Sequence, residues 1–102
     1  ERRKLELARA LAARPRLLLL DEVMAGLNPA ETAEMMELTL GLRRERGLTI
    51  LMVEHVMKAV MGCADRIVVL SQGAKLFEGS PGEVASNPQV IEVYLGEGCE
   101  FR

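Results

Sequence analysis

The chain has 102 residues, which is enough for one small domain or for part of a larger one. Hydrophobic residues make up 49% of it, so the composition indicates a packed core and argues against a disordered chain. Basic residues number 13 and acidic residues 15, which argues against a dedicated nucleic-acid-binding protein, and no apolar run approaches the length of a membrane span.

The first half of the chain predicts a helix, a strand and a second helix. Residues 1–13 carry apolar side chains at helical spacings of three and four, and Pro15 disfavours helix at the residue before it. Residues 16–20 follow as a strand, whose four consecutive leucines suit burial on both faces of a parallel sheet. Residues 28–31 read Asn-Pro-Ala-Glu, a capping-box pattern that predicts a helix from there to about residue 46.

The second half predicts a strand, a short helix, a pair of strands and short closing helices. A turn at residues 71–73 joins the paired strands, and so short a link predicts an antiparallel hairpin. A second capping box, Ser-Pro-Gly-Glu at residues 80–83, starts the closing helices. The predicted ranges are 48–53 for the strand, 56–64 for the helix, 67–70 and 75–78 for the hairpin, and 81–95 for the closing helices.

The first three predicted strands alternate with helices, which indicates a parallel α/β sheet with right-handed crossovers. Three strands plus a hairpin make a thin sheet, and one of its edges would lie open. The chain also begins Glu1-Arg2-Arg3-Lys4, without an initiator Met, and enters a helical pattern at once. We therefore expect the C-terminal piece of a longer protein, with processing of a complete chain as the alternative.

Polar residues follow two of the predicted parallel strands at the point where each strand ends. Asp21 and Glu22 follow the first strand, and Glu54 and His55 follow the second. Each pair alone is more often a solvated loop or a structural histidine, but parallel strands bring their carboxyl ends to one edge, where ligands bind. There Asp21 could hold a magnesium-bound water, Glu22 could polarise an attacking water, and His55 could bond a terminal phosphate oxygen. This set suits phosphoryl transfer, although the 102 residues contain no GxxxxGK[ST] phosphate loop.

Several segments resemble, in order and spacing, those of ABC-type ATPases. Leu-Leu-Leu-Leu-Asp-Glu at residues 17–22 resembles the Walker B segment, and Ala-Gly-Leu-Asn-Pro at residues 25–29 resembles the D-loop. Residues 49–55 are similar to the strand that ends in the switch histidine, and residues 5–11 to the helix that follows the signature motif LSGGQ. Residues 78–83 resemble a segment that closes the domain.

The resemblance implies the fold and its organisation. We expect an α/β fold, the C-terminal portion of a P-loop NTPase domain of the ABC ATPase type, with parallel core strands plus a C-terminal β-hairpin and short helices. The P-loop and most of the signature motif are absent from the 102 residues. The implied segments are the post-signature helix at 1–14, the Walker B segment and D-loop at 16–29, the switch-histidine strand at 48–55, and the closing hairpin and helices at 65–96.

A finer resemblance indicates one branch of this family. Residues 21–29, 54–62 and 90–96 are similar to the ATP-binding subunits of branched-chain amino acid importers. Urea or amide importers and the lipopolysaccharide-export ATPase are related systems, and they remain alternatives for the transported substrate.

The roles of individual residues follow from the resemblance. Asp21 would bind Mg²⁺ through water, Glu22 would act as general base, and His55 would contact the γ-phosphate of ATP, while Glu1 would lie beside the nucleotide of a partner subunit. ATP and Mg²⁺ would both need the absent P-loop. The segment that would cross to the partner in a nucleotide-sandwiched dimer consists of Ala25, Gly26, Leu27, Asn28 and Pro29.

The implied partners are a second ATP-binding subunit, transmembrane permease subunits and, indirectly, a periplasmic substrate-binding protein, with no nucleic acid. The implied location is the cytoplasmic side of the plasma (inner) membrane, where the protein would be peripheral. The sequence departs from the family at Val23, where most members have Pro, and at Asn28, where the general family has Asp. Asn can still cap the helix, so we expect the local structure to survive.

Without the P-loop, we expect the isolated chain neither to bind nor to hydrolyse ATP appreciably. Two other functions are weighed against the importer subunit. A soluble ABC-type ATPase of DNA repair or translation fits poorly with the near-neutral charge and the short ending. A non-enzymatic truncated remnant is favoured if the 102 residues are the whole gene product.

Overall fold

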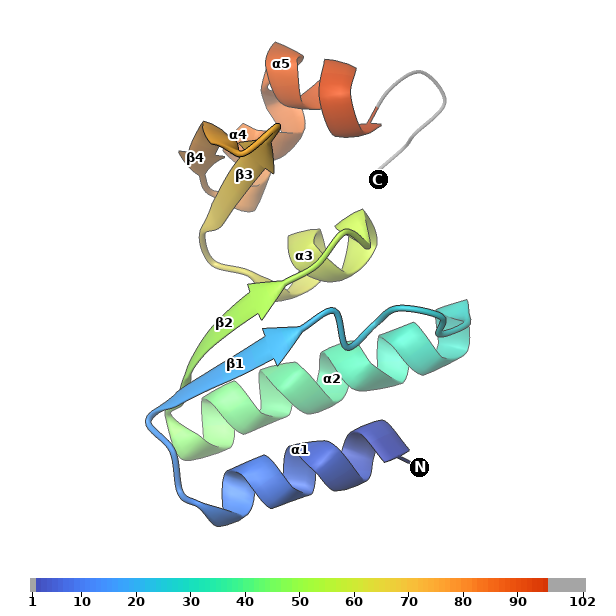
Figure 1. Cartoon of the computed structure of the whole chain (residues 1–102), viewed down its shortest axis with the longest axis vertical. Helices are drawn as coiled ribbons and strands as arrows, with labels where there is room; N and C mark the ends of the chain where they lie inside the picture. Colours follow the sequence, from blue (N-terminus) through green and yellow to red (C-terminus); the bar gives the residue numbers. More distant parts are fainter. Residues whose placement is uncertain (1, 96–102) are drawn as a thin grey trace. The chain divides into compact units, whose positions relative to one another are not determined.

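The computed structural model describes residues 2–95 and divides into two units, Glu1–Ala59 and Val60–Arg102 (Figure 1). The boundary between the units falls within helix α3 (Met57–Cys63). None of the helices in the described range is long and apolar enough to span a membrane.

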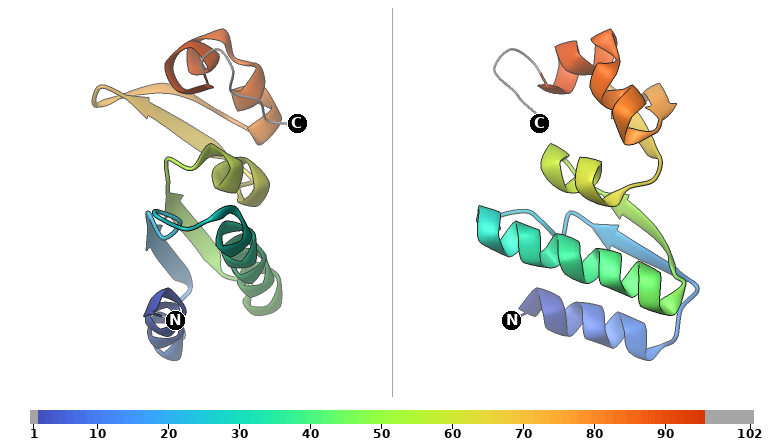
Figure 2. Two further views of the ribbon diagram at one scale, coloured as in Figure 1. Left: turned by 90° about the vertical axis from the view of Figure 1, so that its right-hand side faces the viewer. Right: turned by 180° about the vertical axis from the view of Figure 1, so that it is seen from behind.

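The first unit contains α1 (Arg2–Ala12), β1 (Leu17–Asp21), α2 (Pro29–Arg46) and β2 (Thr49–Val53). The two strands pair in parallel, from Leu17 opposite Thr49 to Asp21 opposite Val53. Figure 2 shows α2 running along one side of this strand pair. The main core of the unit draws on both helices, and its buried members are Leu7, Leu18, Leu20, Leu42 and Leu48.

The opposite face of the β1–β2 pair is open in the described chain. Side chains alternate between the faces of a strand, so Leu18 and Leu20 are buried while Leu17 and Leu19 are exposed. Leu51 and Val53 of β2 are exposed on the same open face. The prediction that the leucine strand is buried on both faces is wrong for this structure, because α1 and α2 contribute to the same core and cover only one face.

The predicted capping box at the start of α2 is confirmed. The Asn28 side chain accepts from the Glu31 backbone N–H at 2.8 Å, and the Glu31 side chain accepts from the Asn28 N–H at 3.0 Å. Gly47 ends the helix with a left-handed φ of 62° and donates its N–H to the Arg43 carbonyl. A second small core involves α2, where Met35 of this helix is buried together with Met24 and Ala59.

The second unit is built on the predicted antiparallel hairpin, β3 (Ile67–Ser71) and β4 (Ala74–Gly79). Gln72 and Gly73 make the turn with positive φ values of 50° and 78°. Helices α4 (Pro81–Ser86) and α5 (Pro88–Val90) and a π-helical turn (Ile91–Leu95) follow the hairpin. The core of this unit consists of Ile67, Val69, Val84 and Val90.

One topological prediction is wrong: β3 is not a third strand of the parallel sheet. Among the described strands it pairs only with β4. The short turn brings β4 beside β3 at little cost in chain entropy, so the local hairpin satisfies the hydrogen bonds of β3 along one edge.

Candidate functional site

The carboxyl ends of β1 and β2 lie side by side and carry the predicted site residues. Asp21 is opposite Val53 at the last register position, and the Glu22 backbone N–H donates to the Val53 carbonyl at 2.8 Å. The chain therefore leaves both strands at the same edge of the sheet, as the sequence predicts, and Glu54 and His55 follow β2 there.

Glu22 and His55 are in direct contact. His55 Nδ1 lies 2.8 Å from Glu22 Oε1, and both side chains are more than half exposed. When Nδ1 carries a proton it donates to the carboxylate, and Nε2 can donate to a phosphate oxygen at the same time only when it is protonated as well, that is, in the imidazolium form. The contact thus joins a candidate base to a candidate phosphate ligand in one exposed pair.

The backbone at Glu22 is unusual. Its φ is 52°, a left-handed value that is uncommon for a residue with a side chain and that occurs often at functional sites. The turn takes Glu22 out of the alternation of β1, so its carboxylate is not bound to follow the side-chain direction of Leu20. Two consecutive carboxylates, those of Asp21 and Glu22, can therefore serve different partners at the same strand end.

The side chain of Asp21 is exposed and makes no hydrogen bond or ion pair with any residue that the structure describes. Strand alternation places it on the open face of the sheet, with Leu19 and Val53. In the described range, no three His, Cys, Asp or Glu side chains gather closely enough to hold a metal ion. Asp21 therefore fits Mg²⁺ only as a one-carboxylate site that nucleotide phosphates and waters would complete.

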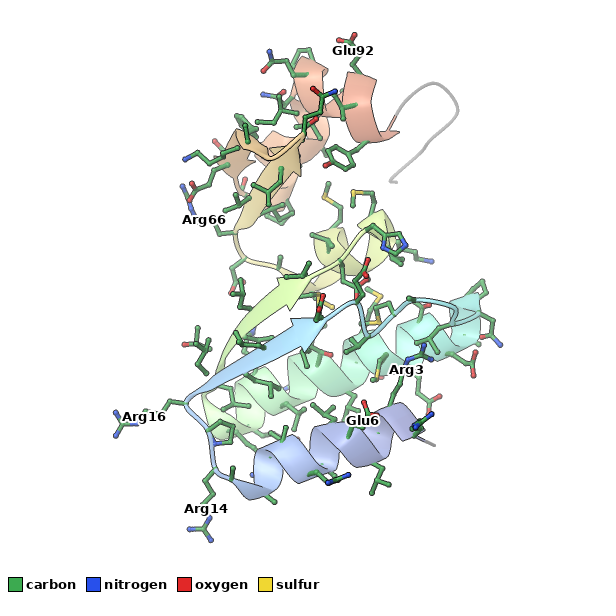
Figure 3. All side chains as sticks on the ribbon, viewed as in Figure 1. Arg3, Glu6, Arg14, Arg16, Arg66 and Glu92 are labelled. Atoms are coloured by element: carbon green, nitrogen blue, oxygen red, sulfur yellow. The ribbon has the colours of Figure 1, made fainter. Side chains whose placement is uncertain are left out.

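The predicted D-loop forms a tight turn between Glu22 and α2. Backbone hydrogen bonds run from the Ala25 N–H to the Glu22 carbonyl and from the Leu27 N–H to the Met24 carbonyl. Gly26 takes a φ of 76°, and the Arg3 guanidinium of α1 donates to the Ala25 carbonyl (Figure 3). Asn28 and Pro29 lie exposed at the start of α2, so this end of the turn is accessible to a partner.

Glu54 is a site residue whose contact the sequence did not predict. Its Oε2 accepts the Met24 backbone N–H at 3.0 Å, whereas its Oε1 is buried and has no hydrogen-bond partner within the described part of the chain. The strand alternation could have indicated the direction of this side chain: Glu54 lies two and four residues after Met52 and Ile50, at a position that faces the helix-covered side of the sheet.

Glu1, the remaining predicted site residue, lies outside the described residues.

Comparison with known proteins shows which families the chain is similar to. A family described as "Branched-chain amino acid ATP-binding cassette transporter" matches residues 74–100. The high-affinity branched-chain amino acid transport ATP-binding protein LivG of Salmonella typhimurium is 52% identical over 97 residues, covering 95% of this chain and 38% of LivG. The lipopolysaccharide export system ATP-binding protein LptB of Acidithiobacillus ferridurans is 42% identical over 97 residues, covering 95% of this chain and 40% of LptB.

The fold agrees with these sequence matches. The crystal structure of MJ1267 in its ADP conformation, an ATP-binding cassette of an ABC transporter, superposes with a TM-score of 0.81 at 31% identity, covering 93% of this chain and 39% of that one. The chain is thus similar to ATP-binding proteins of ABC transporters, among them those of branched-chain amino acid transport. It spans about two fifths of the length of the relatives it matches.

Proposed function

We propose that the chain is the C-terminal part of the ATP-binding subunit of an ABC importer for branched-chain amino acids, and that the complete subunit hydrolyses ATP to power transport. The observation that carries this proposal is the Glu22–His55 contact beside a free Asp21 at the carboxyl edge of a parallel strand pair. The similarity of the chain to LivG supports branched-chain amino acids as the substrate class.

Each site residue has a distinct role in this mechanism. Asp21 would hold Mg²⁺ through a bound water, and the ion would supply charge neutralisation at the phosphates. Glu22 would accept a hydrogen bond from the attacking water and polarise it. His55, as imidazolium, would donate its Nδ1–H to Glu22 and its Nε2–H to a γ-phosphate oxygen. The hydrogen bond between Glu22 and His55 orients both side chains before the nucleotide is engaged.

The assembly around the subunit follows the same proposal. Residues 25–29 contact a second ATP-binding subunit in a nucleotide-dependent dimer, and Glu1 lies beside the partner's nucleotide. Permease subunits anchor the pair to the cytoplasmic side of the membrane, and a periplasmic substrate-binding protein delivers the amino acid. The phosphate-binding loop belongs to the part of the subunit outside these 102 residues, so the isolated chain binds no ATP.

A second candidate is the ATPase of a related ABC system, and the 42% identity to LptB favours lipopolysaccharide export as that system. Both candidates use the same site residues, so they differ in the permease that the subunit serves. Transport of radiolabelled leucine into cells that depend on the complete gene would favour the first candidate. Loss of lipopolysaccharide export on deletion of the gene, with leucine uptake intact, would favour the second.

The first test is the coding DNA upstream of Glu1, which we expect to encode a GxxxxGK[ST] loop in frame. The second is the Mg²⁺-dependent ATPase rate of the complete protein. Glu22→Gln should lower this rate by about 10²–10⁴-fold, because it removes the base, and should leave ATP binding intact. Glu37→Gln, an exposed position on α2, is the control.

Three results would contradict the proposal. They are a stop codon directly upstream of Glu1, an unchanged ATPase rate in Glu22→Gln, and saturable, magnesium-dependent binding of a labelled ATP analogue to the isolated 102 residues. The stop codon would favour a truncated remnant. The unchanged rate would show that Glu22 is not the base. ATP binding by the isolated chain would show that the phosphates can be bound without the phosphate-binding loop.

A further inference from the structure

Glu54 has no role in the mechanism above, although it lies next to His55 and reaches the segment that follows Glu22. We propose that Glu54 is a positioning residue, which fixes the backbone between Glu22 and the D-loop from the end of β2. The inference rests on the proposed ATPase function, and it adds a link between the histidine loop and the D-loop.

The contact joins Glu54 to a backbone group whose residue is itself held in a core. Glu54 Oε2 accepts the Met24 N–H at 3.0 Å. Met24 is 1% exposed and packs against Met35 and Ala59, so its backbone cannot shift without disturbing this core. Met24 also follows Glu22 by two residues, so the Glu54 carboxylate limits how far Glu22 can turn away from His55.

A second anchor acts on the next residue. Arg3 of α1 donates to the Ala25 carbonyl, so the start of the D-loop is held at two successive residues from two different elements. One anchor comes from the segment that follows β2 and carries His55, and the other comes from α1, which resembles the post-signature helix. Movement of either element would therefore displace the backbone of the turn that leads to Asn28 and Pro29.

The chemistry of Glu54 supports a role beyond packing. It occupies a position that faces the helix-covered side of the sheet, where Met52 and Ile50 are apolar. Its Oε1 is buried without a hydrogen-bond partner among the described residues, an arrangement that costs stability and that an apolar side chain would avoid. The Oε2 atom of this carboxylate accepts the Met24 N–H, a contact that a hydrocarbon side chain could not make.

The test uses the complete ATP-binding protein with three variants at Glu54. Glu54→Met keeps the length and removes the acceptor, Glu54→Asp keeps the charge and shortens the reach, and Glu54→Gln keeps both length and acceptor. Glu37→Met on the exposed side of α2 is the matched control. The readouts are kcat, the KM for ATP, and the hydrogen–deuterium exchange of a peptide spanning residues 22–28.

We expect Glu54→Met and Glu54→Asp to lower kcat by about ten- to a hundredfold with little change in KM, because the base is displaced while the nucleotide contacts are kept. Exchange in residues 22–28 should be faster in both variants. Glu54→Gln should recover most of the rate and the slow exchange. If Glu54→Met does not fold, the comparison of Asp with Gln decides the matter.

Two outcomes would overturn the inference: an unchanged kcat in the folded Met and Asp variants, or a Gln variant as impaired as the Asp variant. A purely structural role would lower the thermal midpoint without separating kcat from KM. If the unmutated protein hydrolyses no ATP, the proposed function itself fails, and exchange at residues 22–28 then still decides whether Glu54 holds the Met24 N–H.

Discussion

Glu78 of β4 forms two ion pairs that make the stability of the second unit depend on pH. Its carboxylate contacts Arg66 Nε at 2.7 Å and Lys75 Nζ at 3.1 Å, and these two cations lower the pKa of Glu78 below its usual range. A carboxyl whose pKa is lower in the folded state stabilises that state above the usual glutamate pKa, and the contribution is lost as the pH falls through the lowered value. The ion pairs are solvent-accessible, so the effect is small at high salt.

Glu78→Gln should therefore reduce the acid sensitivity of the protein. Between about pH 6 and about pH 3, the urea midpoint should fall less in this variant than in the unmutated chain. Glu92→Gln is the control, since Glu92 points outward from the π-helical turn (Figure 3) and makes no ion pair with any described residue. Equal acid sensitivity of the Glu78 variant and the unmutated chain would show that these ion pairs do not couple to folding.

At the scale of elements, the start of α2 is both a structural cap and the end of the proposed D-loop. Asn28→Ala removes the acceptor for the Glu31 N–H and should cost about 1 kcal/mol in the free energy of unfolding. Asn28→Asp keeps the cap and adds a negative charge at a helix N-terminus, so its stability should be equal or slightly higher. Urea unfolding of the two variants measures both effects. An Asn28→Asp variant as unstable as Asn28→Ala would contradict the capping role.

The accuracy of the sequence predictions also varies by element. The start of α2, the start of α4 and the β3–β4 hairpin were predictable because each depends on residues within about four positions of one another. The placement of Asp21, Glu22 and His55 followed from one long-range step, the parallel pairing of β1 with β2. The pairing of β3 was mispredicted because alternating helices and strands do not specify which strands become neighbours.

Contacts that depend on a side chain reaching the backbone of another element were beyond prediction. The sequence places Glu54 next to His55, but its hydrogen bond to the Met24 N–H depends on the turn that follows Glu22. The positive φ of Glu22 could not be predicted from the sequence either, because a glutamate does not favour it. The sequence thus predicted that Asp21, Glu22 and His55 lie at one edge of the strand pair, whereas it did not predict the hydrogen bonds that orient them.

At the scale of the whole molecule, the open face of the β1–β2 pair is the feature with the widest consequence. Leu19 and Leu51 lie opposite each other in the strand register and are 64% and 57% exposed. Leu17 and Val53 extend the same face, so four apolar side chains meet solvent in the described chain. Apolar surface of this kind promotes association and aggregation unless another segment covers it.

Replacing Leu19 by Lys and Leu51 by Glu should make the isolated 102-residue chain more soluble and lower its binding of a hydrophobic dye. Opposite charges across the two strands are compatible with pairing, so the free energy of unfolding should change by less than about 0.5 kcal/mol. Leu18→Glu, one residue along β1 but 5% exposed, should instead unfold the chain and serves as the control.

The same double replacement separates the isolated chain from the complete subunit. If the chain is part of a larger cassette, as proposed, the remainder of that cassette covers this sheet face, and the two charges would then be buried. The replacement should therefore be neutral in the 102 residues and destabilising by several kcal/mol in the complete protein, because burial removes the hydration of both charges and their mutual attraction does not make up for it. An equal, small effect in both would show that the face stays exposed in the complete protein and would leave it as a surface for association.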